Sequence, residues 1–205
     1  ADELLRLLKL IALRTGNLVN ISNLTQDIGL QRDTIGRYLS LLERLFLIRT
    51  LPAWHRNAAK RLIKAPKIHI IDSGLGCALT GLKTADWHQP DKSFGGMLES
   101  FVVQQLICQS GWVDNELHFS HYRDKDQVEV DLVIEQGERL WGVEIKKAAS
   151  VQARDGRGLA RLAEQAGESW QGGILLYTGT NTLPLADIPN GFAVPMNQLW
   201  KKDAP

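Results

Sequence analysis

The stretch VEVDLVIEQGERLWGVEIK, residues 128–146, predicts two neighbouring β-strands joined by a tight turn. Apolar and polar residues alternate in 128–134, and the same period of two recurs in 140–146, which is typical of strands with one face toward a core. Gly137 and Glu138 fit the two central positions of a hairpin turn that begins with glycine. With this turn, the two strands are antiparallel and their register is defined.

The predicted register places Asp131 directly opposite Glu144, with Cβ atoms about 4.5–5.5 Å apart. Lys146 follows two positions along the same face as Glu144. Two carboxylates in this position repel one another, so a shared proton or a bound cation is needed to offset the repulsion. Mg²⁺ favours carboxylate oxygens and keeps several of its waters. The alternative is an exposed strand pair whose acids, and Lys146 beside them, simply reach solvent.

Residues 94–109 (FGGMLESFVVQQLICQ) predict a helix that precedes these strands. At about 100° per residue, Glu99 falls inside the apolar arc, between Leu106 and Val103. A carboxylate buried there is costly unless it is paired or binds a metal. The alternative, that Glu99 lies at the edge of the apolar side and reaches solvent, stays open.

These residues together indicate metal-assisted hydrolysis of a phosphodiester. Glu99, Asp131 and Glu144 are the candidate ligands of Mg²⁺ or Mn²⁺, and they form the candidate catalytic group together with Lys146. Lys146 would orient the nucleophile or stabilise the transition state, while the metal would lower the pKa of the attacking water.

The first part of the chain predicts a separate module, a winged helix-turn-helix over residues 1–75. Ser22 is the expected N-cap of its short second helix, and Gly29 separates that helix from the third. The two strand-like runs enclose a basic segment, as a wing requires. The expected helices and strands are 3–13, 23–28, 31–46, 47–51 and 67–71.

Charge favours nucleic acid as the partner of this module. The whole chain has a net charge of +1, but residues 1–75 hold twelve basic and six acidic side chains. In a DNA-binding module of this kind, the start of the third helix reaches base edges and the basic segment holds phosphates. The alternatives are a solvated connector in the basic segment, and a module that binds protein or acts as a spacer. The candidate nucleic-acid-binding residues are Gln31, Arg32, Thr34, Arg37, Arg56, Lys60, Arg61 and Lys64.

Composition excludes several classes of protein. The 205 residues are 44% hydrophobic and 23% charged, which is typical of a globular chain. No apolar stretch is long enough to span a membrane, and no secretory leader is evident. Cys77 and Cys108 imply no disulfide framework, so a cytoplasmic protein is expected. Residues 76–84 imitate a phosphate-binding loop, but Leu82 stands where lysine is required, so a helix end and its turn are predicted.

Asp131, Glu144-Ile145-Lys146 and Glu99 resemble the PD-(D/E)XK nuclease signature. The order of helix, three strands, helix (153–166) and strand (173–178) is similar to that fold. The Asp131 motif lacks the usual preceding proline, having Glu129-Val130-Asp131. The resemblance implies a restriction-endonuclease-like αβββαβ domain over residues 76–205, and hence an α/β (α+β) protein.

A second resemblance covers nearly the whole chain. The chain resembles a bacterial domain of unknown function that is usually found C-terminal to an AAA-type ATPase module. This implies that the chain is the C-terminal region of a longer ATPase, whose nucleotide-binding part would be its partner. A metal-dependent nuclease or DNA-processing module is the implied function, and the alternative is a non-catalytic nucleic-acid- or protein-binding appendage. The runs that carry the resemblance are RDTIGRYLSLLERLFLIRTLPAW, KIHIIDSGL, LESFVVQQL, HYRDKDQVEVDLVIE and VEIKKA.

Overall fold

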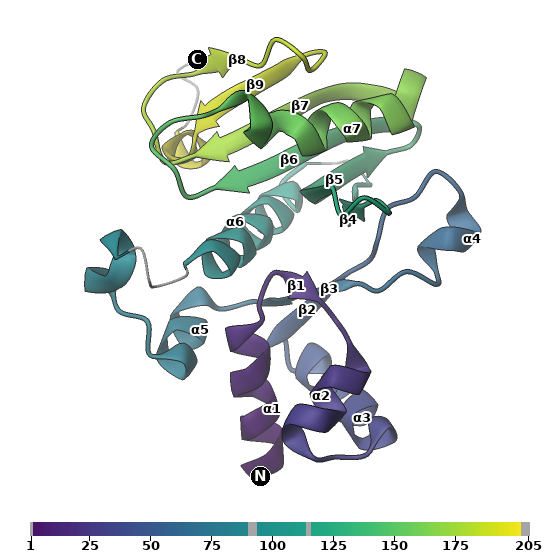
Figure 1. Cartoon of the computed structure of the whole chain (residues 1–205), viewed down its shortest axis with the longest axis vertical. Helices are drawn as coiled ribbons and strands as arrows, with labels where there is room; N and C mark the ends of the chain where they lie inside the picture. Colours follow the sequence, from purple (N-terminus) through teal and green to yellow (C-terminus); the bar gives the residue numbers. More distant parts are fainter. Residues whose placement is uncertain (1, 90–93, 114–115, 202–205) are drawn as a thin grey trace. The chain divides into compact units, whose positions relative to one another are not determined.

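The computed structural model describes residues 2–89, 94–113 and 116–201, and shows a mixed α+β protein (Figure 1). The chain separates into two compact units. The first contains Ala1–Ala53 and Leu62–Leu106, and the second contains Trp54–Arg61 and Ile107–Pro205. In this division the boundary expected after residue 75 falls inside the first unit.

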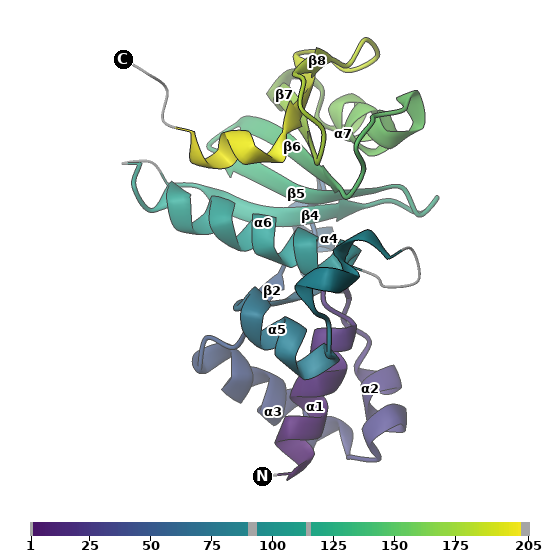
Figure 2. The ribbon, with the colours of Figure 1, turned by 90° about the vertical axis from the view of Figure 1, so that its left-hand side faces the viewer.

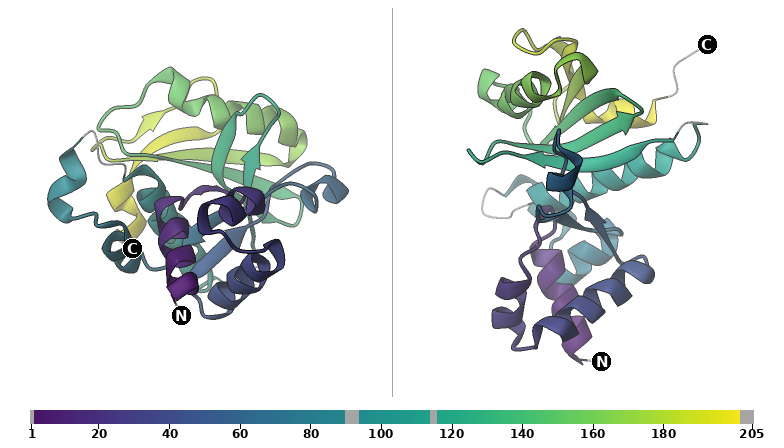
Figure 3. Two further views of the ribbon diagram at one scale, coloured as in Figure 1. Left: turned by 60° about the horizontal axis from the view of Figure 1, so that its bottom comes forward. Right: turned by 90° about the vertical axis from the view of Figure 1, so that its right-hand side faces the viewer.

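The first unit combines helices with a three-stranded antiparallel sheet of order β1-β3-β2. Helices α1, α2 and α3 are the purple coils in Figures 2 and 3, and Figure 2 shows α5 beside α1. The short helices and the strand pair around the basic segment are therefore present as the sequence predicts. The elements are α1 (Asp2–Leu13), β1 (Asn17–Leu18), α2 (Ile21–Ile28), α3 (Arg32–Arg44), β2 (Ile48–Leu51), β3 (Lys67–Ile70), α5 (Ser73–Thr80), η1 (Thr84–His88) and α6 (Gly95–Ser110), of which α6 continues past the boundary of the unit.

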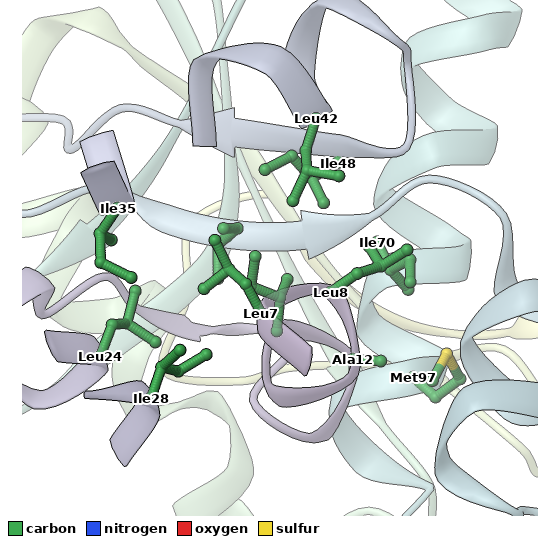
Figure 4. Packing of buried hydrophobic residues seen from close by; sticks show 12 residues of the cluster. Leu7, Leu8, Ala12, Leu24, Ile28, Ile35, Leu42, Ile48, Ile70 and Met97 are labelled. Carbon is green, nitrogen blue, oxygen red and sulfur yellow. The ribbon is translucent and has the colours of Figure 1, made fainter. Parts of the chain in front are cut away.

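The core of this unit forms where the apolar sides of the helices meet the sheet (Figure 4). Leu7 of α1, Ile35 of α3 and Ile70 of β3 are completely buried within it. Helix α2 ends at Gly29, whose φ of +77° suits a residue without a Cβ. Its N-cap is Asn20, which accepts a hydrogen bond from the Asn23 N–H at 3.1 Å. The prediction of Ser22 was wrong because the extended backbone that a cap requires lies at Asn20.

The second unit is built on a six-stranded mixed sheet of order β4-β5-β6-β7-β9-β8. Strands β4, β5 and β6 are antiparallel, whereas β6, β7 and β9 run parallel, with α7 along one face (Figure 1). The elements are α4 (Ala58–Arg61), β4 (His118–Arg123), β5 (Glu129–Gln136), β6 (Arg139–Lys146), η2 (Ala153–Gly156), α7 (Arg157–Ala166), η3 (Gly167–Ser169), β7 (Trp170–Tyr177), β8 (Leu183–Pro184), β9 (Gly191–Pro195) and η4 (Met196–Trp200).

The predicted hairpin register is confirmed. Leu132 pairs with Val143 and Gln136 with Arg139, and the turn glycine, Gly137, has a φ of +59°. Continued by one position beyond the last pair, Leu132 with Val143, this register sets Asp131 opposite Glu144, at the end of the hairpin away from the turn.

Two glycines allow α7 to lie directly against the sheet. A Cβ on Gly142 of β6 would lie 2.7 Å from Leu159 Cδ2, and one on Gly158 of α7 would lie 2.0 Å from the Glu129 carbonyl oxygen. Leu159 and Leu162 fill the space between helix and sheet and are fully buried. The close approach at Gly158 brings the N-terminus of α7 beside the start of β5.

Segment Trp54–Arg61 is part of the second unit although the first unit's strands flank it in sequence. The Trp54 backbone N–H donates to the His121 carbonyl at 2.6 Å, and its indole Nε1 donates to Glu135 Oε1 at 3.0 Å. Arg61 donates to both oxygens of Glu135, each at 2.8 Å. The chain thus passes from the first unit to the second and back.

Among the described residues, no helix combines the length and apolar character needed to cross a bilayer.

Candidate functional site

A cleft of about 360 Å³ lies where β6 ends, β5 begins and α7 starts. We call it the acidic cleft, because five of its side chains are carboxylates and three are cationic. It lies entirely within the second unit. Its charged lining residues are Asp126, Glu129, Asp131, Glu144, Asp155, Lys146, Arg154 and Arg157.

Asp131 and Glu144 are buried in this cleft, with exposed fractions of 8% and 6%. Asp131 Oδ2 accepts a hydrogen bond from the Ile145 N–H at 2.9 Å, across the hairpin. Glu144 Oε1 lies 2.7 Å from the Lys146 ammonium. The structure therefore brings together three of the four predicted catalytic residues, on the face and in the register that the sequence predicts.

Lys146 remains a cation in this setting. Burial acts to lower its pKa, but the charge and hydrogen bond of Glu144, with smaller effects from Asp131 and Asp155, raise the pKa above the ordinary value of 10.5. At neutral pH the ammonium is protonated, so it can donate hydrogen bonds and stabilise negative charge, and it cannot accept a proton.

The donors in the acidic cleft fit a hard divalent cation. Mg²⁺ is commonly held by one or two carboxylates and completes its shell with water and substrate phosphate. Asp131 and Glu144 are the residues that would hold such an ion. Across residues 2–89, 94–113 and 116–201, no group of three or more His, Cys, Asp or Glu side chains is placed to share one metal.

Glu99 is paired with a lysine of the first unit. Its Oε1 lies 2.8 Å from the Lys67 ammonium, and the two side chains are 14% and 2% exposed. His69 Nε2 lies 4.0 Å from the same carboxylate oxygen. The helical wheel correctly marked Glu99 as an acid on an apolar side, but it could not identify Lys67 on a distant strand as its partner. The role of Glu99 as a metal ligand stays a prediction.

Helix α3 carries a groove of about 540 Å³ that includes two of the predicted nucleic-acid-binding residues, Arg32 and Arg37. Gln31, the N-cap of α3, is exposed, and Thr34 accepts a hydrogen bond from Arg37 at 3.3 Å. Ser40 and Arg44, which the sequence analysis did not single out, line the same groove and follow at helical spacing on the exposed side. The α3 groove is lined by Ile21, Arg32, Asp33, Gly36, Arg37, Ser40, Leu41 and Arg44.

The four predicted phosphate-binding residues of the basic segment do not belong to one unit. Arg56, Lys60 and Arg61 count with the second unit and Lys64 with the first. Besides its ion pair with Glu135, the Arg61 guanidinium lies over the Trp54 ring at 5.6 Å. Arg61 therefore contributes to the structure of the second unit, a role that the sequence did not predict.

Comparisons with known proteins assign no activity. A family model described as "Domain of unknown function (DUF4143)" matches residues 94–199, and one described as "Domain of unknown function (DUF8612)" matches residues 1–86. Uncharacterized proteins of Mycobacterium bovis and Mycobacterium tuberculosis are each 30% identical over 191 residues, which is 90% of this chain. The chain spans about 40% of the length of these curated relatives. No solved structure matches the chain.

Proposed function

This chain belongs to the family described as a domain of unknown function (DUF4143), and we propose that its second unit is a metal-dependent phosphodiesterase that acts on nucleic acid. One observation carries the proposal: Asp131, Glu144 and Lys146, from two paired strands, line one cleft. The order along the chain of α6, β4, β5, β6, α7 and β7 resembles the order expected of a PD-(D/E)XK nuclease, which supports the same proposal.

Each side chain has a defined part in the proposed reaction. Asp131 and Glu144 would hold the divalent cation, which supplies an activated water and neutralises developing charge. Lys146, protonated beside Glu144, donates a hydrogen bond to a phosphate oxygen and stabilises the transition state. Arg154 and Arg157, at the edge of the cleft, orient the phosphodiester, since guanidinium groups bind phosphate oxygens in pairs.

The first unit, in this proposal, is a winged helix that brings nucleic acid to the second. Helices α2 and α3 are separated by a short turn at Gly29, and the paired strands β2 and β3 follow. Arg32, Arg37 and Arg44 give the α3 groove a net positive charge, which favours a polyanion.

We also propose that the chain is the C-terminal region of an AAA-type ATPase in a bacterial cytoplasm. The curated relatives are much longer than the stretch that matches here. The ATPase module of the same protein would be the partner that couples nucleotide hydrolysis to the activity of the cleft.

A nicking assay tests the phosphodiesterase proposal. The chain is incubated with plasmid DNA and labelled oligonucleotides in Mg²⁺ or Mn²⁺, and cleavage that EDTA abolishes is expected. Glu144→Gln and Asp131→Asn should each lower the rate about 100-fold or more. The matched control is Glu138→Gln, in the turn of the same hairpin, which should cleave normally. An inactive native chain, or equal rates for native and Glu144→Gln, would refute the proposal.

A second candidate function is a non-catalytic appendage that binds nucleic acid or protein. It is favoured by the pairing of Glu99 with Lys67 and of Glu144 with Lys146, which neutralises these acids within the protein. It predicts binding that survives both EDTA and Glu144→Gln. If the partner is nucleic acid, the affinity should fall steeply with added salt.

A further inference from the structure

The second unit contains an apolar pocket of about 500 Å³ beside the acidic cleft. One wall is formed by η2 and the first turns of α7, and the other by β8 and the segment that follows it. Ile188 and Ala193, both buried, form part of its lining. The volume is within the range of small-molecule sites, about 300–1,000 Å³. The pocket is lined by Val151, Gln152, Ala153, Arg154, Gly156, Arg157, Ala160, Leu183, Pro184, Leu185, Ala186, Asp187, Ile188 and Ala193.

Two arginines join the pocket to the cleft. Arg154 and Arg157 line both, and both are exposed. Neither guanidinium forms an ion pair or hydrogen bond within the described part of the chain. Each therefore retains its full set of donors for an external anion, in a fork geometry that matches phosphate oxygens.

A nucleotide has the chemistry that this arrangement requires. Its phosphate is an anion for the two arginines, and its base is a flat, weakly solvated group that suits an apolar pocket. Enzymes that take a base out of the stack hold it between apolar or aromatic side chains and read its edge by hydrogen bonds. Asp187, at the rim of the pocket, offers a carboxylate to the N–H groups of a base.

We infer that the apolar pocket receives one unpaired nucleobase while Arg154 and Arg157 hold the phosphate next to it. The inference rests on the proposed function, because it defines the substrate of the same cleft. A base within a duplex is stacked and paired and cannot enter the pocket without being extruded. The substrate class is therefore single-stranded nucleic acid, or a strand with an unpaired nucleotide at the site of cleavage.

The test measures binding, so that it does not depend on cleavage. The whole chain carrying Glu144→Gln, together with Arg32→Ala and Arg37→Ala to remove duplex binding at the α3 groove, is titrated with three fluorescent probes. They are a single-stranded oligonucleotide, the same sequence as a duplex, and a single strand that carries abasic linkers. The single strand should bind about tenfold more tightly than either of the others, because only it presents accessible bases. Equal affinity for all three probes would overturn the inference.

Two pairs of variants locate the binding. Ala160→Leu, made in the same chain, narrows the pocket. It should lower the affinity for the intact single strand about tenfold and leave the affinity for the abasic strand unchanged. Ala166→Leu makes the same change at the other end of α7 and should have no effect. Arg157→Ala should lower the affinity for the intact and the abasic strand by the same factor, whereas the control Arg139→Ala should change neither affinity. Unchanged affinity in Ala160→Leu, or an equal loss in Ala166→Leu, would overturn the inference.

The outcomes also separate this inference from the phosphodiesterase proposal. If the binding pattern is found but the native chain does not cleave in Mg²⁺ or Mn²⁺, the base-binding pocket stands and the enzyme proposal fails. If the native chain cleaves single strands and duplexes at equal rates and shows no dependence on residue 160, the pocket assignment fails and the enzyme proposal stands. Displacement of the intact single strand by octanoate, with no difference between the intact and abasic strands, would identify an apolar anion as the occupant and overturn the inference.

Discussion

At the scale of single residues, the ion pair of Lys67 with Glu99 explains a pattern that is otherwise unfavourable in both segments. Lys67 stands in a strand whose four residues are all buried, and Glu99 stands on the apolar side of a helix. Either charge alone would be strongly destabilising there, because a buried ion without a partner loses its hydration. Each charge is therefore tolerated at its buried position because the other one neutralises it.

Glu99→Gln should accordingly lower the free energy of unfolding by about 3–5 kcal/mol, because it removes the carboxylate charge that lies 2.8 Å from the buried Lys67 ammonium. Urea denaturation of the native chain and the variant measures the difference. Glu138→Gln, at a turn, is the control and should change stability by less than about 0.5 kcal/mol. Native-like stability in Glu99→Gln, combined with lost cleavage, would instead identify Glu99 as a metal ligand.

Tyr122 gives the second unit a stability that depends on pH. Its side chain is 4% exposed, and its hydroxyl finds no hydrogen-bond partner within the described ranges. Burial, followed by the charge of Asp124, raises its pKa from 10.0 to about 12. The folded state thus keeps the phenol neutral over a pH range in which the unfolded chain ionises it.

Because the folded pKa is the higher one, the contribution of Tyr122 is complete below about pH 10 and is lost as the pH rises to about 12. Tyr122→Phe should remove this part of the alkaline loss. It should also leave stability at neutral pH equal or up to about 1 kcal/mol greater, since a buried hydroxyl without a partner disappears. Denaturant melts at about pH 8 and about pH 11 test this. A variant as sensitive to alkali as the native chain would contradict it.

At the scale of elements, two glycines within helices differ in whether the fold has room for a Cβ at their position. Gly158 is required by the fold, because its Cβ would collide with the Glu129 carbonyl. Gly36, within α3, has no atom within 4 Å of the position that a Cβ would occupy. Nothing inside the described structure requires glycine there, and Gly36 lines the α3 groove. Its lack of a side chain would let a ligand approach the helix backbone closely.

Gly36→Ala should therefore raise the free energy of unfolding by about 0.5–1 kcal/mol, the usual gain for alanine over glycine inside a helix. The same change should weaken duplex DNA binding if the α3 groove holds it. Gly158→Ala is the matched comparison and should be clearly destabilising. Chemical denaturation and a DNA titration of both variants provide the measurements. A less stable Gly36→Ala variant would show that the groove is packed by the protein itself.

At the scale of the whole molecule, the two units are not consecutive pieces of chain. Trp54 lies in the core of the second unit, packed against the Tyr122 ring at 6.0 Å between centroids, although β2 of the first unit ends at Leu51. Arg61 and Glu135 hold the other end of the same segment. A cut of the sequence at one position therefore cannot separate the units cleanly.

Trp54→Ala should destabilise the second unit by about 3–5 kcal/mol, as expected when a large buried side chain is removed. Hydrogen exchange localises the effect: amides of β4 to β7 should lose protection, while those of α1 to α3 should change less. Trp112→Ala is a control, since Trp112 is 84% exposed. Loss of protection confined to α1 to α3 would show that Trp54 stabilises the first unit and would contradict the prediction.

The sequence predicted helices and strands well wherever the apolar residues of a short stretch recur with the period of a helix or a strand. The helices near 3–13, 31–46 and 94–109 and the hairpin of 128–146 were found within a few residues of their observed bounds. Strands β8 and β9 were not individually predicted, and of helix α5 only the end and its turn were, which the structure confirms at Thr80 and Gly81. These elements are short and depend on neighbours that are distant in sequence, so their local pattern is weak.

The sequence by itself determined the two-residue period of β5 and β6 and the glycine turn between them, and these alone place Asp131 and Glu144 on one face. That inference is local, because side chains alternate along a strand and the turn sets the register. Only the tertiary structure decided that Lys67 is the partner of Glu99, that Trp54 and Arg61 belong to the second unit, and that an apolar pocket lies beside the acidic cleft. These arrangements join segments many residues apart, and the packing that brings them together leaves no periodic trace in any one of them.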